Sequence, residues 1–183
     1  PGTLPFVASA FSHAFVAIAA GKAYAREPRP RGFWILSVAL SILPDLDVIG
    51  FAFGIRYEDF LGHRGFTHSI AFAMVAGALG LPLAGPPSWR LWLYLSAVTA
   101  SHGVLDAMTD GGLGVAFFSP FDRTRYFLPF QPVRVSPIGI APFFSLWGLE
   151  VLGTEIVYLW VPAALAAWAV RRRRRASPPA GSP

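Results

Sequence analysis

The residues in this chain that could do chemistry are a small set of histidines and aspartates placed in or beside strongly apolar stretches. All four histidines belong to it: His13, His63, His68 and His102. Four of the ten acidic residues share the same stretches or their ends: Asp45, Asp47, Asp106 and Asp110. Ionisable groups in apolar surroundings are costly, so each is a candidate for function. The chain has no cysteine, so a bound metal would need imidazole and carboxylate ligands, which suit Zn²⁺, Mn²⁺ or Fe.

The spacing of two pairs indicates a shared site. His102 and Asp106 are four residues apart, which on a helix places them on one face about one turn from each other. Asp45 and Asp47 follow Pro44, and on a regular helix they would point in different directions. A helix loosened by the proline could turn both carboxylates toward one cavity or let them bridge two metals. Two or more close metals could activate a water and stabilise the leaving oxygen of a phosphoester.

The other histidines lie at the start of two apolar stretches or within them. His63 and His68 bound the string His-Arg-Gly-Phe-Thr-His, in which Gly65 permits a turn before a helix. Arg64 in this string is the best candidate to hold a phosphate, because its guanidinium can bind two oxygens. His13 is predicted about halfway through a membrane, either as a ligand or as a hydrogen-bond partner between helices.

Three further arginines could contact a substrate phosphate from a long connection: Arg123, Arg125 and Arg134. Their alternative role is contact with lipid head groups. Other hydrolytic motifs are missing from the sequence: there is no Gly-x-Ser-x-Gly elbow, phosphate-binding P-loop or His-Glu-x-x-His string. Serine hydrolases, P-loop nucleotidases and ordinary zincins are therefore unsupported.

Composition predicts that a bilayer surrounds these residues. The chain is 54% hydrophobic and 14% charged, with a mean hydropathy of +0.51, whereas soluble domains carry about 25% charged residues. We therefore expect an all-α, polytopic helical membrane protein of one domain, residues 1–170. Its five segments, each close to the roughly 20 residues needed to span a bilayer, are predicted at 4–21, 33–53, 67–86, 91–110 and 150–170.

The distribution of basic residues predicts the orientation. Ten of the fifteen lie in the connections 22–32 and 86–90 or in the run Arg171–Arg175, which share one side if all five segments cross. That side is expected to be cytoplasmic, with the C-terminus there and the histidines and aspartates toward the outer face. The basic run serves as a topology anchor rather than a nucleic-acid site, and residues 171–183 are expected to form a disordered tail. The outer connection 111–149 is rich in aromatic residues and is expected to be an ordered cap or a re-entrant segment at the interface.

Taken together, four features resemble the bacterial inner-membrane metal-dependent hydrolases described as LexA-regulated. They are His13, Leu43-Pro-Asp-Leu-Asp, His63-Arg-Gly-Phe-Thr-His-Ser and His102-Gly-Val-Leu-Asp-Ala, and the resemblance covers roughly residues 10–112. That family is similar in turn to zinc-dependent phospholipases C and single-strand nucleases, which cleave phosphodiesters with metal-activated water.

The resemblance implies a set of ligands. They are His13, Asp47, a histidine of the 63/68 pair, His102 and Asp106, with Asp106 a candidate bridge between two metals. No histidine follows His102, so a third metal of the soluble kind would need Asp110, Asp122 or Glu150.

We therefore expect a membrane hydrolase with two zinc ions, or Mn or Fe, that cleaves a phosphoester of a phospholipid or another lipid-linked phosphate near the outer face. Asp45 is the expected general base or orienter of a ligand histidine, and Arg64 the expected catalytic cation. The alternative is a non-catalytic membrane protein, either an ion or proton pathway or a metal-stabilised scaffold.

Overall fold

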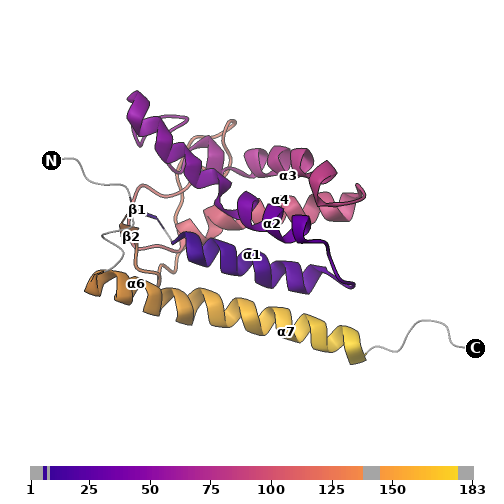
Figure 1. Ribbon diagram of the computed structural model, residues 1–183. Helices are drawn as coiled ribbons and strands as arrows, with labels where there is room; N and C mark the ends of the chain where they lie inside the picture. The colour runs from indigo at the N-terminus through magenta and orange to yellow at the C-terminus, as the bar shows by residue number, and fades with distance from the viewer. Residues whose placement is uncertain (1–5, 8, 138–144, 177–183) are drawn as a thin grey trace, which may run out of the picture.

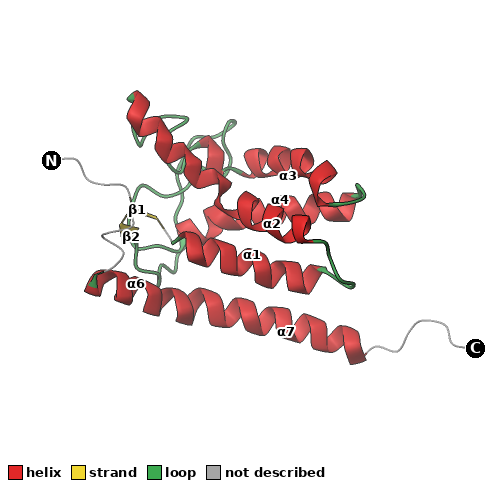
Figure 2. Cartoon of the chain, in the orientation of Figure 1, coloured by secondary structure: helices red, strands yellow, loops and turns green. Residues whose placement is uncertain are grey.

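The computed structural model describes residues 6–7, 9–137 and 145–176, and over these residues the fold is helical (Figures 1 and 2). The elements are β1 (Phe6–Val7), α1 (Ala10–Tyr24), α2 (Arg31–Ile42), η1 (Leu43–Phe53), η2 (Phe66–His68), α3 (Ile70–Ala84), α4 (Trp89–Ala107), β2 (Ser136–Pro137), α6 (Leu146–Glu155), η3 (Ile156–Trp160) and α7 (Val161–Ala176). The two short strands pair antiparallel. The expectation of an all-α protein is confirmed.

The predicted segments correspond to helices of the bundle. α2 continues into the 3₁₀ helix η1, and α6 continues through the π-helical turn η3 into α7. These two continuous helices, Arg31–Phe53 and Leu146–Ala176, are each long and apolar enough to cross a membrane. Part of the predicted segment 4–21 lies outside the described residues, and its helix begins at Ala10.

Helix α4 lies at the centre of the bundle and packs against α1, α2 and α3. Its inner face is apolar over the first half, where Leu91, Leu95 and Val98 join Phe33 of α2 in one buried cluster. The Tyr94 hydroxyl donates a hydrogen bond of 2.9 Å to Ser37 Oγ within this region. Over its second half the same face carries His102 and Asp106, so α4 bears both the core and the candidate site.

The long helix formed by α6, η3 and α7 is attached to α1 by polar contacts at the start of α1. Glu155 is fully buried, and its carboxylate accepts the Ser9 N–H at 2.6 Å and the Ser9 hydroxyl at 2.5 Å. Trp160 Nε1 donates to Ser12 Oγ at 2.7 Å. Because Ser9 precedes the first turn of α1, the carboxylate satisfies a helix-terminal donor that would otherwise be buried without a partner.

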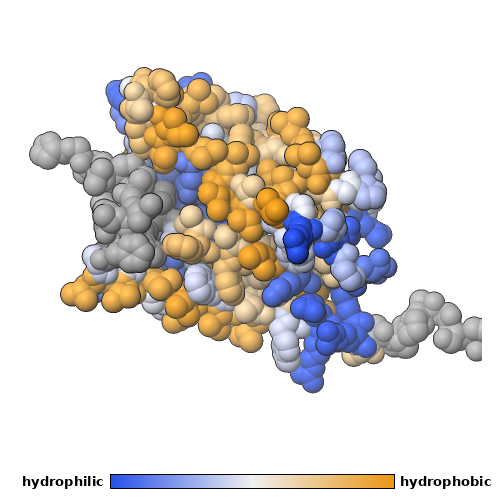
Figure 3. All heavy atoms as spheres, viewed as in Figure 1, coloured by the Kyte–Doolittle hydropathy of each residue, from blue (hydrophilic) through white to orange (hydrophobic). Residues whose placement is uncertain are grey.

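The bundle has two chemically different ends. Residues 22–31, Arg90 and Arg171–Arg175 lie at one end, here named the basic end, where hydrophilic side chains gather (Figures 1 and 3). The histidines and their aspartates lie at the other end, where α1 begins, α2 and α4 end and α3 begins. Between the two ends the surface is largely apolar (Figure 3), with exposed side chains such as Ile35, Leu79 and Leu165. A bilayer is the solvent that suits this surface.

The structure corrects one expected boundary. The basic tail was expected to be disordered from residue 171, but α7 continues through Ala176. Arginine is a good helix former, and cations near a helix C-terminus are favoured by its dipole, so the run extends the helix instead of ending it. Residues 177–183 of the predicted tail lie outside the described residues.

The connection after α4 is ordered, as expected for a cap, over the part that the structure describes. Val115 and Tyr126 exchange two backbone hydrogen bonds of 2.9 Å, and the Ala116 N–H donates to the Arg64 carbonyl at 3.0 Å. The cap therefore covers the segment that carries His63 and Arg64. Residues 138–144 of this connection lie outside the described residues.

The packing of α3 on α4 generates a stability prediction. A Cβ at Gly77 would lie 2.3 Å from Ser96 Oγ and 2.8 Å from its backbone nitrogen, so Gly77→Ala should lower the free energy of unfolding by about 1–3 kcal/mol. Gly153→Ala is the control, because nothing lies within 4 Å of its Cβ position and alanine favours a helix by up to about 1 kcal/mol. Tryptophan fluorescence during unfolding in detergent measures both, and equal stability of the two variants would contradict close α3–α4 packing.

Candidate metal centre

The loosening predicted at Pro44 is present and brings Asp45 toward the histidines. The helix changes from α to 3₁₀ winding at Leu43 and keeps it through Phe53. A 3₁₀ helix has about 3.0 residues per turn rather than about 3.6, so residues two apart diverge less around the axis. Asp45 and Asp47 therefore both contact histidines. Asp45 lies near Nε2 of His102, whereas Asp47 lies near Nδ1 of His63 and of His68.

Four side chains converge on one point: Asp45, His68, His102 and Asp106, which could together hold a metal ion. His102 Nε2 lies 3.2 Å from Asp45 Oδ1 and 3.1 Å from His68 Nε2. The Asp106 Oδ2 atom lies 3.3 Å from His68 Nε2 and 3.7 Å from His102 Nε2. The fifth separation, from His68 Nε2 to Asp45 Oδ1, is 3.8 Å.

These separations fit a tetrahedral ion. Ligand atoms about 2.0–2.2 Å from a tetrahedral metal lie about 3.3–3.6 Å from one another, and the five donor–donor distances of the cluster span 3.1 to 3.8 Å. Two nitrogen and two oxygen donors without sulfur match Zn²⁺, Mn²⁺ or Fe. The residues present therefore fit a transition-metal ion.

The protonation of the two imidazoles supports the same conclusion. His102 Nδ1 donates to the Ser41 carbonyl at 2.7 Å, and His68 Nδ1 faces Asp47 Oδ2 at 3.2 Å. With the proton on Nδ1, each ring directs the lone pair of Nε2 toward the other and toward two carboxylates. A metal ion among these acceptors would offset their mutual repulsion, and partners that hold Nδ1 are typical of histidine ligands to metals.

The structure places both aspartates in groups that could hold a metal ion. Asp45, expected to be a base or orienter, lies in the four-donor cluster, and the expected ligand Asp47 lies in a second group with His63 and His68. Asp47 lies behind the four-donor cluster, where its Oδ1 accepts from His63 Nδ1 at 2.7 Å and its Oδ2 accepts from the Thr67 hydroxyl at 2.6 Å. The buried His63 Nε2 has no hydrogen-bond partner.

His13 lies against the cluster from the start of α1. Its ring stacks on that of His102 with 3.8 Å between centroids, and its Nε2 lies 3.7 Å from Asp106 Oδ1. The ring is fully buried, and neither nitrogen has a hydrogen-bond partner. The alternative role of His13 as a hydrogen-bond partner between helices is therefore not seen, while a ligand role is compatible with the two unpartnered nitrogens.

Arg64 contacts the carboxylate of the cluster instead of an opening. Its side chain is fully buried, with Nε 3.3 Å from Asp106 Oδ2. The other nitrogens donate to the Gly111 carbonyl at 2.8 Å and to Thr109 Oγ1 at 3.0 Å. The expected contact with a substrate phosphate is thus replaced by a contact that neutralises and positions Asp106. The backbone turn at this residue, with φ of 62°, directs the side chain inward.

The three arginines of the long connection do not join the cluster. Arg125 donates to the carbonyls of His63 and Tyr57 at 2.8 and 2.9 Å, which fixes the backbone behind the site. Arg134 pairs with Asp110 at 2.9 Å. Arg123 lies over the Phe60 ring at 4.9 Å from its centroid. Their predicted phosphate contacts remain predictions.

The acidic residues considered for a third metal are occupied elsewhere or lie at the surface. Asp110 accepts from Arg134 and from the Val135 N–H, Asp122 accepts from the Thr124 N–H and the Tyr126 hydroxyl, and Glu150 is exposed. Among the described residues, the groups able to hold a metal do not include them.

Several residues that support the site were missed. Thr67 and the Ser41 carbonyl hold Asp47 and His102 in place, and the Tyr57 ring packs edge-on against His63 at 5.2 Å. Burial raises the pKa of Tyr57, so the phenol stays neutral beside Arg64 and Arg125. The role of Thr67 could have been predicted, because Thr67 lies between His63 and His68 in the sequence. The role of the Ser41 carbonyl could not, because every residue has a backbone carbonyl.

The cluster generates a prediction about metal content. His102→Ala removes one of the four converging donors, so the purified protein should lose tightly bound transition metal. Asp110→Asn is the matched control, because Asp110 lies near the same end of α4 but pairs with Arg134. Elemental analysis by mass spectrometry measures the metal per chain. Equal metal content in both variants, or none in the unaltered protein after loading, would contradict the site.

Comparisons with known proteins agree with the membrane setting. The family model described as YdjM inner membrane protein matches residues 9–176. The chain is similar to a protein of Escherichia coli (strain K12) named inner membrane protein YbcI, with 34% identity over 170 residues that cover 90% of this chain and 97% of the relative. No solved structure matches the chain. The described helices, the apolar surface and the matched length lead to one assignment: the chain belongs to the YdjM inner membrane protein family.

Proposed function

We propose that the chain is a membrane-bound, metal-dependent hydrolase that cleaves a phosphoester of a phospholipid or another lipid-linked phosphate. The observation that carries the proposal is the convergence of Asp45, His68, His102 and Asp106, with five donor–donor separations of 3.1 to 3.8 Å. Soluble zinc-dependent phospholipases and nucleases, which this sequence resembles distantly, use histidine and aspartate ligands for phosphodiester cleavage.

The residues of the site have separate roles in the proposed reaction. A divalent ion in such a site lowers the pKa of a water and polarises a phosphoryl oxygen. Asp47 and the Ser41 carbonyl hold the two ligand histidines in orientation. Arg64 positions Asp106 and balances its charge. His13, whose Nε2 lies 3.7 Å from the other oxygen of Asp106, could help Asp106 to hold a second ion.

The partly exposed edge of the cluster, at Asp45, supports a lipid substrate. Asp45 is 16% exposed, while the side chains of His68, His102 and Asp106 are fully buried. Leu46 and Ile49 beside it on η1 are exposed, so an approach at Asp45 passes along an apolar surface. A substrate with acyl chains could lie on that surface with its phosphate at Asp45, where a water would also enter.

The rival function, an ion or proton pathway, receives less support. A pathway needs polar groups along the whole bundle, and the described ionisable groups of the interior gather at the histidine end. Toward the basic end the interface of α2 and α4 is filled by Phe33, Leu91 and Leu95. A metal-stabilised scaffold would need no exposed ligand, so the partial exposure of Asp45 supports catalysis.

Orientation follows from the charges of the two ends. Ten of the fifteen basic residues belong to the basic end, so we place that end and the C-terminus in the cytoplasm and the metal centre toward the outer face. The membrane would then deliver the substrate sideways to its outer leaflet.

Hydrolysis is tested on the purified full chain reconstituted with mixed phospholipids and loaded with Zn²⁺ or Mn²⁺. Release of phosphate or a phosphorylated head group should be lost on addition of chelator. Asp106→Asn should reduce the rate by more than about 100-fold, since even the partners that orient metal ligands are worth about 10–100-fold. Asp110→Asn should stay within about twofold of the unaltered protein, because Asp110 pairs with Arg134.

Two results would contradict the hydrolase. One is a protein that binds the metal but releases no product from any lipid phosphoester, which would assign the cluster to a scaffold. The other is ion flux across vesicles without hydrolysis, which would assign it to a pathway.

The orientation is tested with single cysteines, which the natural sequence permits because it has none. Phe121→Cys, on the exposed cap at the histidine end, should react with a membrane-impermeant thiol reagent in intact spheroplasts. Glu27→Cys, in the connection at the basic end, should react only after lysis. Both positions are exposed, so burial does not bias the comparison, and the reverse pattern would place the site on the cytoplasmic face.

A further inference from the structure

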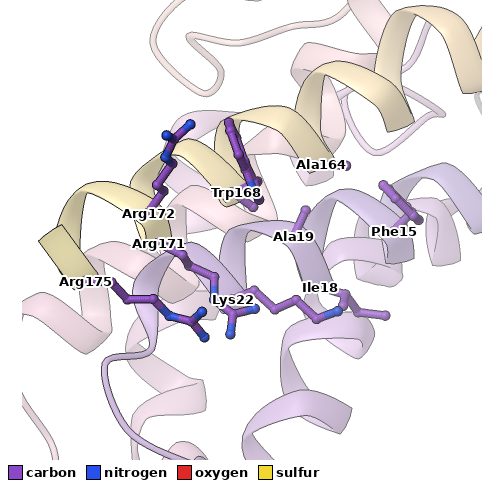
Figure 4. A pocket seen from close by; sticks show the side chains of 10 residues that line it. Phe15, Ile18, Ala19, Lys22, Ala164, Trp168, Arg171, Arg172 and Arg175 are labelled. Carbon is purple, nitrogen blue, oxygen red and sulfur yellow. The ribbon is translucent and has the colours of Figure 1, made fainter.

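A groove between α1 and α7 combines a basic mouth with an apolar floor. It encloses a cavity of about 460 Å³ at the basic end of the bundle (Figure 4). The metal cluster lies at the other end, so the groove has no part in the chemistry proposed above.

The sequence builds the groove from two helix faces. On α1 it is lined by Phe15, Ile18, Ala19 and Lys22, whose spacing of three and four residues is that of one helix face. On α7 Ala164, Ala167, Trp168, Arg171 and Arg175 repeat the same spacing. The small side chains of Ala19, Ala164 and Ala167 leave space between the two helices. The basic residues lie about one turn further along each face, Lys22 on α1 and Arg171 on α7.

Polarity changes along the groove. In Figure 4 the side chains of Arg171 and Arg175 lie at one end with Lys22 nearby, and Phe15 lies at the other end. Ala19 and Ala164 lie between them on the two helices. A ligand of this shape has an anionic head and an apolar tail.

The charge at the mouth is not balanced by the residues around it. Lys22, Arg171, Arg172 and Arg175 line the groove, and no acidic residue does. Arg172 lies over the Trp168 ring at 5.2 Å from its centroid, where the aromatic ring and the cation mark an interfacial position. Arg174 donates to the Ala23 carbonyl at the end of α1, which holds the two helices together at the mouth.

We propose that this groove binds an anionic phospholipid, with the phosphate between Lys22, Arg171 and Arg175 and an acyl chain along Ala19, Ala164 and Phe15. Basic pockets between membrane helices at a cytoplasmic boundary bind anionic head groups. The apolar floor favours a lipid over a free anion, because a free anion has no apolar chain to bury against it. The bound lipid would occupy the space between α1 and α7 beside the contact of Arg174 with the Ala23 carbonyl.

The test measures binding of phosphatidylglycerol, phosphatidylcholine and inorganic phosphate to the purified full chain in neutral detergent by native mass spectrometry. The variant Lys22→Gln/Arg171→Gln/Arg175→Gln should weaken phosphatidylglycerol binding by about 100-fold, since each basic residue near an anionic head group is worth about 1 kcal/mol, or about fivefold. The control Arg26→Gln/Arg31→Gln/Arg90→Gln removes the same charge from the same end outside the groove and should cost less than about threefold.

A second pair of variants tests the floor without changing charge. Ala164→Phe fills the groove and should weaken phosphatidylglycerol binding, whereas Ala166→Phe, which is exposed and does not line the groove, should not. His102→Ala should leave this binding unchanged, which separates the lipid site from the metal centre.

Three results would overturn the proposal. Equal losses in the two triple variants would show diffuse electrostatic attraction. Equal binding of phosphatidylcholine and phosphatidylglycerol would show that the groove does not select lipids by the charge of the head group. Competition by inorganic phosphate as effective as that of the lipid would assign the mouth to a free anion.

Discussion

The arrangement of the helices at one end of this structure depends on Asp106, a carboxylate that is buried among apolar helices. Asp106 is fully buried, and a buried charge without partners is destabilising by several kcal/mol. Its partners come from separate parts of the chain: His13 from α1, Arg64 and His68 from the segment before α3, and His102 from α4 itself. The need to compensate one carboxylate therefore draws the ends of these segments to a single point.

The local features of the fold follow from that convergence. The 3₁₀ winding after Pro44 brings Asp45 to His102, and the left-handed backbone of Arg64 turns its guanidinium toward Asp106. The cap after α4 then closes over the segment, with Arg125 holding two of its carbonyls. At the opposite end no such centre exists among the described residues; there α7 packs along α1, Arg174 donates to the Ala23 carbonyl, and the groove lies between the two helices.

Much of this arrangement could be predicted from the sequence, because it depends on spacing. The four-residue interval of His102 and Asp106, the proline before Asp45 and the clustering of basic residues each correspond to what the structure shows. The place of Asp45 among the converging donors was not predicted, because it depends on how many residues wind per turn, which a proline perturbs without fixing. The inward turn of Arg64 and the contacts of Arg125 depend on a backbone conformation and on carbonyls far along the chain, and neither leaves a pattern in residue types.

X-ray absorption spectroscopy of the protein loaded with zinc tests most directly whether the buried histidine and aspartate cluster holds the metal, because it counts the ligands and identifies them. The account predicts nitrogen and oxygen neighbours at about 2.0–2.2 Å, close to four in number, with the outer-shell scattering of two imidazoles from His68 and His102. A shell of six oxygens without imidazole scattering would contradict it, because the ion would then be hydrated at the surface and the buried cluster would not be its site.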